Sequence, residues 1–303
     1  MLIFQNITKT FKSELLSRPF VALDDVSFEI PSGGMVGFLG ANGAGKTTSL
    51  KIVMDFIRPD SGSVSFASEM GKSRIDVFKN VGFLPERPYF YPNLTGNEFL
   101  QFMGSLSEMN KKSISEAVTR WAPRFKIDHA LNRPLRTYSK GMLQRIGFLA
   151  TILHEPKFII LDEPLSGLDP IGRKELKDVI VEVHRAGKTV FFSSHIVPDI
   201  EEICDRVIFL KEGKLIYDGE VEPLLKSDQG MTFTVKYKSP LSPSDLKTPF
   251  LGSEDFPGNI KSIKVEEKHK QEILKELISR DIDVTEIELV QPNLEEIFYH
   301  IKG

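Results

Sequence analysis

Residues 40–47 form a glycine-rich stretch that is suited to hold a phosphate chain. They read Gly-Ala-Asn-Gly-Ala-Gly-Lys-Thr and fit the pattern G-x-x-x-x-G-K-[ST]. Glycine lets the backbone wrap closely around a phosphate with successive N–H groups pointing inward, and the following helix adds the positive end of its dipole. Lys46 supplies a charge for the β- and γ-phosphates, and Thr47 supplies a hydroxyl for Mg²⁺. The pattern predicts nucleotide binding by Gly40, Asn42, Gly43, Ala44, Gly45, Lys46, Thr47 and Thr48.

A second candidate site lies in residues 158–163, where the run Phe-Ile-Ile-Leu ends in Asp162 and Glu163. The apolar run predicts a buried strand. An acid at the tip of a strand beside a phosphate loop can hold the Mg²⁺ shell, and Asp162 suits that role. Glu163 could polarise a water molecule for in-line attack on the γ-phosphate. The competing interpretation is a turn or helix-capping acid just before Pro164, which the neighbouring phosphate loop disfavours.

The elements that must position these residues alternate between strands and helices. Residues 26–30 alternate apolar and polar, and residues 35–39 and 158–161 are apolar runs of strand length. A largely helical stretch, residues 89–153, interrupts this pattern. The other predicted elements are a strand at 189–192, a hairpin of 207–210 and 214–217, and helices at 46–57, 98–103, 114–121, 143–153 and 172–186. This pattern predicts an α/β core with an inserted helical subdomain, in a domain that covers residues 1–222.

The composition changes near residue 222, which predicts a C-terminal accessory domain over residues 223–303. Residues 239–259 are rich in Pro, Ser and Gly and are typical of a loop or linker. Around them the pattern predicts strands at 232–236, 260–265 and 284–290 and helices at 267–279 and 294–301. We therefore expect a small α+β domain.

The composition also limits the classes of function. In 303 residues, Lys plus Arg number 39 and Asp plus Glu number 42, which gives a formal charge of −3. Nucleic-acid binders usually carry a strong basic excess, so no nucleic-acid partner is expected. The single cysteine, Cys204, cannot form an internal disulfide, which favours a reducing compartment. No apolar run approaches the ~20 residues that span a bilayer, and no secretory signal is apparent. We expect any membrane connection to go through a partner.

The motifs and their order resemble an ABC-type ATPase subunit over residues 1–222. Residues 138–142, Tyr-Ser-Lys-Gly-Met, occupy the place of the family's signature, usually LSGGQ. Residues 166–169, Ser-Gly-Leu-Asp, look like the family's D-loop. His195 follows an apolar strand, like the switch histidine, and Glu86 stands where the family usually has the glutamine of its Q-loop. The resemblance implies a P-loop ABC ATPase core that uses ATP and Mg²⁺.

The resemblance also implies that two such domains pair head to tail, with each ATP between the phosphate loop of one subunit and the signature of the other. Ser139 would donate a hydroxyl hydrogen bond, and Gly141 a backbone N–H, to the γ-phosphate across the interface. Closure on ATP and opening after hydrolysis would move a membrane partner. The resemblance assigns Lys46, Glu163 and His195 to catalysis. It assigns Thr47, Glu86 and Asp162 to the metal. In addition to the phosphate loop, it assigns Ser139, Gly141 and Asp169 to nucleotide binding.

The signature departs from the family pattern, because Lys140 replaces a glycine and Met142 replaces a glutamine. The form Tyr-Ser-Lys-Gly-Met resembles subunits of bacterial ABC-2-type exporters. It implies an exporter ATPase at the cytoplasmic face of the cell membrane, cytoplasmic when free. The subunit would work as a homodimer, or with a paralogous ATPase subunit, under separate membrane-spanning permease subunits. The alternatives are an importer ATPase and a soluble ABC ATPase that acts on ribosomes or DNA.

Two aromatic features have more than one interpretation. The family stacks adenine on an aromatic residue near the N-terminus, where Phe11 fits the position best and Phe20 is the competitor. Residues 88–92 form an aromatic cluster just after the Q-loop position, which the resemblance places beside the groove for a transporter's coupling helix. Packing of the helical subdomain on the core explains that cluster equally well.

Overall fold

The computed structural model describes residues 1–12, 19–226 and 232–290 of the chain. The chain divides into two compact units, Met1–Val221 and Glu222–Gly303, whereas the sequence predicts a boundary after residue 222. All candidate site residues lie in the first unit.

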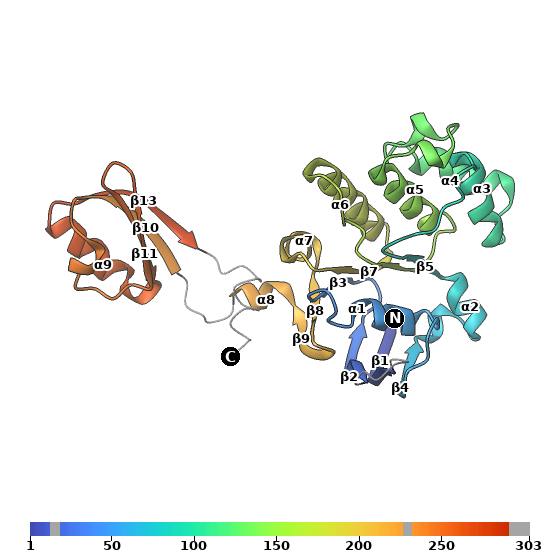
Figure 1. Ribbon diagram of the computed structural model, residues 1–303, viewed down its shortest axis with the longest axis horizontal. Helices are drawn as coiled ribbons and strands as arrows, with labels where there is room; N and C mark the ends of the chain where they lie inside the picture. Colours follow the sequence, from blue (N-terminus) through green and yellow to red (C-terminus); the bar gives the residue numbers. More distant parts are fainter. Residues whose placement is uncertain (13–18, 227–231, 291–303) are drawn as a thin grey trace. The chain divides into compact units, whose positions relative to one another are not determined.

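A mainly parallel sheet forms the centre of the first unit (Figure 1). Its strands are β3 (Met35–Leu39), β5 (Val81–Leu84), β6 (Phe158–Leu161), β7 (Thr189–Ser194), β8 (Arg206–Lys211) and β9 (Lys214–Glu220). In the described residues their order is β5-β6-β7-β3-β8-β9, and only the β8–β9 pair is antiparallel. Every residue of β3, β6 and β7 is buried, as expected for parallel strands that are covered on both faces.

An antiparallel sheet covers one face of this central sheet. It consists of β1 (Leu2–Phe11), β2 (Phe20–Ile30) and β4 (Ser61–Phe66), in the order β2-β1-β4. Phenylalanine rings form a continuous stack through both sheets. The ring centroids are 4.5 Å apart for Phe4 and Phe28 in the antiparallel sheet, 5.6 Å for Phe28 and Phe38 between the sheets, and 5.0 Å for Phe38 and Phe191 in the central sheet. Helix α1 (Lys46–Val53) adds buried residues to the same core.

Helices lie on the other face of the central sheet (Figure 1). They are α3 (Gly96–Leu106), α4 (Lys111–Trp121), α5 (Lys140–Ile152), α6 (Pro170–Arg185) and α7 (Val197–Ile203); two short helices, α2 (Arg74–Lys79) and α8 (Val221–Lys226), lie elsewhere in the chain. Polar caps start the helices of the predicted helical subdomain: Thr95 accepts from the Glu98 amide at 3.2 Å, and Asn110 from the Ser113 amide at 2.9 Å. Within the described residues, no helix is long and apolar enough to cross a membrane.

The described part of the second unit contains a four-stranded antiparallel sheet, against which helix α9 packs. Its elements are β10 (Thr232–Lys238), β11 (Gly252–Phe256), β12 (Ile260–Glu266), α9 (Glu267–Ser279) and β13 (Asp283–Val290), with strand order β11-β12-β10-β13. Ile273 and Leu277 of α9 share a buried core with Val235, Tyr237 and Ile263 of the sheet. The helix predicted at 294–301 lies outside the described residues.

Two sequence predictions of elements are wrong. The helix predicted at 46–57 ends at Val53, because the chain turns at Asp55 with a left-handed φ of 60°. The loop predicted at 239–259 contains β11. All residues of that edge strand are exposed, so it has no apolar alternation to reveal it, and its backbone pairing with β12 holds it in place.

Candidate active site

Four parallel strands bring the predicted motifs to one edge of the central sheet. The phosphate loop follows β3, Asp162 and Glu163 follow β6, His195 follows β7, and Glu86 lies two residues after β5. The strands end in register, since Leu39 pairs with Ser194, Leu161 with Phe192, and Leu84 with Leu161. Ligands of open α/β sheets bind outside the carboxyl ends of the strands. The motifs therefore meet where such a fold places its ligand.

The phosphate loop has a conformation that requires glycine. Gly43 and Gly45 have φ values of 84° and 107°, in the left-handed region that disfavours other residues. A side chain at Gly45 would also place its Cβ 2.7 Å from the carbonyl oxygen of Ala22. Gly45 caps the N-terminus of α1, so the loop leads directly into the positive end of a helix. The loop thus has the backbone that a phosphate cradle needs.

Glu163 is the centre of the polar network in this site. Its Oε1 lies 3.2 Å from the Lys46 ammonium, and its Oε2 lies 2.9 Å from Nδ1 of His195. The Lys46 ammonium also donates a hydrogen bond of 2.6 Å to the Gly40 carbonyl oxygen. The Glu163 side chain is only 10% exposed and its φ is 50°, a strained value that is found at functional sites. These contacts place a buried carboxylate between a lysine and a histidine.

Ser193 joins the two acids, and the sequence analysis did not select it. Its hydroxyl accepts a hydrogen bond from the Glu163 amide at 2.9 Å and donates one to Asp162 Oδ1 at 2.7 Å. The serine belongs to β7 and the acids follow β6, so the contact depends on the pairing of these strands. The only local signal is the position of Ser193 near the end of an apolar strand, two residues before His195.

Asp162 has the surroundings of a magnesium ligand. Burial raises the pKa of its carboxyl, hydrogen bonds from Ser193 and Thr47 oppose that rise, and the negative charges of Glu163 and Glu86 add to it. A divalent cation would relieve this clustering of negative charge, and Mg²⁺ prefers carboxylate and hydroxyl oxygens together with substrate phosphates. In the described part of the chain, no group of three or more His, Cys, Asp or Glu residues could hold a metal alone. The donors therefore fit a Mg²⁺ ion that phosphate oxygens help to hold.

A cavity of about 340 Å³ opens at this edge of the sheet. Its lining contains these predicted residues: Asn42, Gly43, Gly45, Lys46, Thr47, Thr48, Glu86, Glu163 and His195. Phe20, Ala22, Ala41 and Ser166 complete the lining and were not predicted, except that Phe20 is the competitor for adenine stacking. The predicted residues Gly40, Ala44 and Asp162 are buried behind it.

Phe11, the preferred adenine-stacking residue, does not line this cavity. Phe11 lies opposite Phe20 in the pairing of β1 and β2. Of these two rings, Phe20 lines the cavity that contains Lys46. The Phe11 ring has the Lys9 ammonium 5.6 Å from its centroid. The geometry therefore favours Phe20 over Phe11 as the aromatic platform.

Three further predicted residues lie at the starts of helices and do not line the cavity of their own chain. Ser139 caps α5 by accepting from the Met142 amide at 3.2 Å, and Gly141 lies in the first turn of that helix. Asp169 caps α6 by accepting from the Gly172 amide at 3.0 Å. Ser139 and Asp169 are exposed, so both are open to a second molecule.

Comparisons with known proteins identify relatives of the whole chain. The family model described as "ABC transporter" matches residues 23–166. The uncharacterized ABC transporter ATP-binding protein YxlF of Bacillus subtilis is 32% identical over 303 residues, which is 99% of both chains. A solved structure of an ATP-binding subunit of an ABC transporter has a TM-score of 0.64 and 25% identity, over 74% of this chain and 92% of that chain.

A second solved structure shares the fold at lower identity. It is the dimeric post-hydrolysis state of the ATP-binding cassette MJ0796 bound to ADP and Pi. Its TM-score is 0.65 at 22% identity, over 73% of this chain and 99% of that chain. These likenesses confirm the predicted α/β fold of a P-loop ABC ATPase.

Proposed function

This chain belongs to the ABC transporter family and is an ATPase, and from that premise we propose that it powers export through separate membrane-spanning subunits. The chain would lie at the cytoplasmic face of the cell membrane. The observation that carries the proposal is the contact of Glu163 with both Lys46 and His195 beside the phosphate loop. Such a group can bind a triphosphate and activate water at the same edge of the sheet.

The residues of the site divide the work of hydrolysis. Lys46 and the loop amides hold the β- and γ-phosphates, and Glu163 accepts the proton of the attacking water. His195, 2.9 Å from Glu163 Oε2, orients that carboxylate. Thr47 and Asp162, with Glu86 nearby, would hold Mg²⁺, which would supply positive charge for the phosphate oxygens.

The Lys46–Glu163 ion pair implies an order of events. At a distance of 3.2 Å, the Lys46 ammonium engages the Glu163 carboxylate in the nucleotide-free chain. The arriving phosphates compete for that ammonium and draw it away. The Glu163 carboxylate is then released from the lysine and can turn to the attacking water when a nucleotide occupies the loop.

We infer that a second copy of the chain completes each nucleotide site. Ser139, Gly141 and Asp169 do not line the cavity of their own chain, and their helix N-termini can each add a partial positive charge. In a head-to-tail dimer they would meet the γ-phosphate bound by the partner subunit. A paralogous ATPase subunit in place of the second copy is the alternative.

The direction of transport rests on the signature. The form Tyr-Ser-Lys-Gly-Met at residues 138–142 favours an exporter, and an importer ATPase is the second candidate. A soluble ATPase acting on ribosomes or DNA is a weaker candidate, because the chain has a formal charge of −3 and lacks a basic excess.

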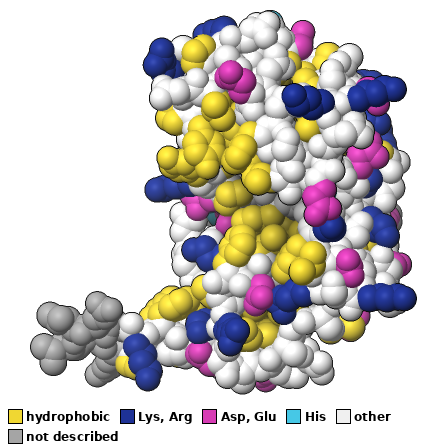
Figure 2. Space-filling view, turned by 90° about the vertical axis from the view of Figure 1, so that its right-hand side faces the viewer, with side chains coloured by type: hydrophobic (Ala, Val, Ile, Leu, Met, Phe, Trp, Pro, Cys, Tyr) yellow, Lys and Arg dark blue, Asp and Glu magenta, His cyan; other side chains and the backbone are white. Residues whose placement is uncertain are grey.

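An exposed aromatic patch is the proposed docking surface for the membrane subunits. Tyr89 is 79% exposed, and the Tyr91 ring lies edge-on to Phe102 with centroids 5.4 Å apart. Beside them a groove of about 330 Å³ is lined by residues 91–94 and Phe102. Figure 2 shows hydrophobic side chains gathered on this side of the molecule, where α3 lies. Aromatic anchors in an apolar groove suit an amphipathic helix of a partner.

Replacing Tyr89 and Tyr91 by Ser should reduce recovery of the membrane subunits at least about tenfold, because aromatic anchors carry much of the energy of an interface. The measurement is affinity purification of the chain from gently solubilised native membranes, with the co-purifying proteins quantified. ATP turnover by the isolated chain should not change. The control is Phe256→Ser, which removes an exposed aromatic residue from the second unit. Co-purification of ribosomes or DNA, without a multi-span membrane protein, would refute the transport proposal.

Replacing Phe20 by Ala should weaken ATP binding about tenfold, because a base stacked on an aromatic ring contributes about 1–3 kcal/mol. Calorimetric titration with MgATP measures the effect. Phe11→Ala is the matched control, since Phe11 is the cross-strand partner of Phe20 and lies outside the cavity lining. A loss of affinity in Phe11→Ala alone would instead restore Phe11 as the stacking residue.

A further inference from the structure

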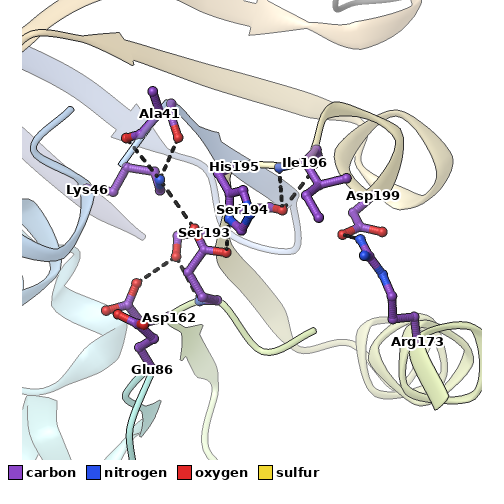
Figure 3. A network of polar contacts seen from close by, with 12 residues as sticks. Ala41, Lys46, Glu86, Asp162, Arg173, Ser193, Ser194, His195, Ile196 and Asp199 are labelled. Atoms are coloured by element: carbon purple, nitrogen blue, oxygen red, sulfur yellow. Dashed lines mark hydrogen bonds and ion pairs between the residues drawn. The ribbon is translucent and has the colours of Figure 1, made fainter. Parts of the chain in front are cut away.

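A partly buried ion pair joins the helices that follow the D-loop segment and the switch histidine (Figure 3). Helix α6 begins directly after Asp169, and α7 begins two residues after His195. Nη2 of Arg173, in the first turn of α6, donates a hydrogen bond to Oδ2 of Asp199, in the first turn of α7. The Asp199 side chain is only 4% exposed. The pair therefore fixes the starts of the two helices relative to each other.

The positive charge of Arg173 at this position does not stabilise helix α6 itself. A cation near a helix N-terminus opposes the helix dipole, and the first turn of α6 contains Arg173 and no acid. Asp199 compensates this charge, and its other oxygen, Oδ1, lies 3.8 Å from the Lys177 ammonium. Lys177 also pairs with Glu202 of α7. Cations of α6 thus flank both oxygens of one buried carboxylate of α7.

One end of this link is tied to the D-loop segment. The Arg173 amide donates a hydrogen bond of 2.9 Å to the carbonyl oxygen of Asp169, whose side chain caps the same helix turn through Gly172. Asp169 is the last residue of the D-loop segment, and Ser166 at its start lines the cavity. A shift of this segment would therefore move Arg173 with it.

The other end of the link is tied to the catalytic histidine. The Asp199 amide donates to the carbonyl oxygen of Ile196 at 3.3 Å, and the Ile196 amide donates to Oγ of Ser194 at 3.0 Å. His195 lies between Ser194 and Ile196 in the chain, and its Nδ1 lies 2.9 Å from Glu163 Oε2. The position of Asp199 therefore constrains the short segment that aims the histidine at the general base.

We propose that Asp199 and Arg173 are positioning residues for ATP hydrolysis. Their ion pair fixes the position of His195, and through it that of Glu163, relative to the D-loop segment. When a second subunit contacts that segment, the position of the general base Glu163 therefore changes. The inference rests on the proposed hydrolytic roles of Glu163 and His195 and on the proposed dimer. A displacement of a catalytic group by about 1 Å, caused far from the chemistry, can cost about 100-fold in rate.

Asp199→Asn in the full chain tests the proposal. We expect kcat for MgATP to fall at least about tenfold and KM to change by less than about threefold, because the pair lies outside the cavity and acts on the hydrolytic step. The matched control is Asp218→Asn, which removes an Arg206–Asp218 pair of 2.7 Å between β8 and β9. Its kcat should equal that of the parent. A kcat of Asp199→Asn equal to that of this control would overturn the inference.

Two further variants separate positioning from simple support of the fold. Arg173→Met combined with Asp199→Leu removes both charges, and buried pairs replaced by apolar residues often keep or raise stability. Arg173→Lys keeps the charge and loses the planar guanidinium group that donates to Asp199. We expect the double variant to recover the Tm of the parent while its kcat stays low, and Arg173→Lys to lose part of kcat. Recovery of kcat together with Tm would overturn the inference. A parent chain without ATP turnover would instead refute the proposed function.

Discussion

Glu163→Gln is expected to lower kcat for ATP by about 100- to 10,000-fold, the range that a positioned general base contributes. The glutamine has the same shape but cannot accept the proton of the attacking water. It also removes the 3.2 Å ion pair with Lys46, so the ammonium is free to bind phosphate and ATP affinity should not fall. ATP that binds but does not react should hold two chains together. Gel filtration with light scattering, with and without MgATP, measures this dimer.

Two controls make the Glu163→Gln result specific. Glu212→Gln changes another glutamate with a φ of 50°, outside the cavity, and should leave kcat and the elution volume unchanged. Adding Ser139→Ala to Glu163→Gln should abolish the ATP-dependent dimer while a single chain still binds ATP. A strictly monomeric Glu163→Gln chain at saturating MgATP would contradict the head-to-tail dimer.

Most of the candidate site could be predicted because its residues lie in short continuous motifs at strand ends. Residues 35–39 and 158–161 are apolar runs, and each leads directly into reactive groups. Once parallel strands are predicted, their carboxyl ends must meet at one edge. This reasoning brings Lys46 and Glu163 together, the family resemblance adds His195, and the cavity lining contains all three.

The remaining features of the site depend on pairing between distant segments. Ser193 contacts Asp162 only because β6 and β7 are neighbours in a particular register. Phe11 and Phe20 are equivalent in type and are paired across β1 and β2, where the register shifts at several points. Only the three-dimensional arrangement shows which ring borders the cavity.

Two strands that the sequence patterns did not reveal, β1 and β4, have weak or interrupted apolar alternation. In β1 the alternation of Leu2 and Phe4 breaks before Ile7, where Asn6 has a φ of 48° and the register shifts. In β4 no residue is fully buried, and the strand is held by its pairing with β1. Strand β4 lies at the edge of its sheet and needs backbone hydrogen bonds on one side only, so its composition is a poor guide to it.

Lys46→Ala is expected to weaken MgATP binding by about 30-fold to several-thousand-fold. Truncating one partner of a buried, hydrogen-bonded charge pair costs about 2–5 kcal/mol, and ~1.4 kcal/mol corresponds to tenfold. The variant removes the charge that faces the phosphates and also leaves Glu163 buried without its lysine. Equilibrium titration with MgATP gives the affinity, and turnover should fall in parallel. Hydrolysis at the parent rate would contradict the assignment of the phosphate site.

A double variant divides the loss in Lys46→Ala between its two causes. In Lys46→Ala with Glu163→Gln, the phosphates lack the lysine but no longer meet an uncompensated carboxylate. Affinity should therefore recover in part relative to Lys46→Ala alone, and the recovery measures the coupling between the two side chains. Lys46→Ala should also lower the Tm of the nucleotide-free chain, because the carboxylate is only 10% exposed and loses its cation. No recovery of affinity and no change in Tm would mean that the ion pair does not regulate the empty site.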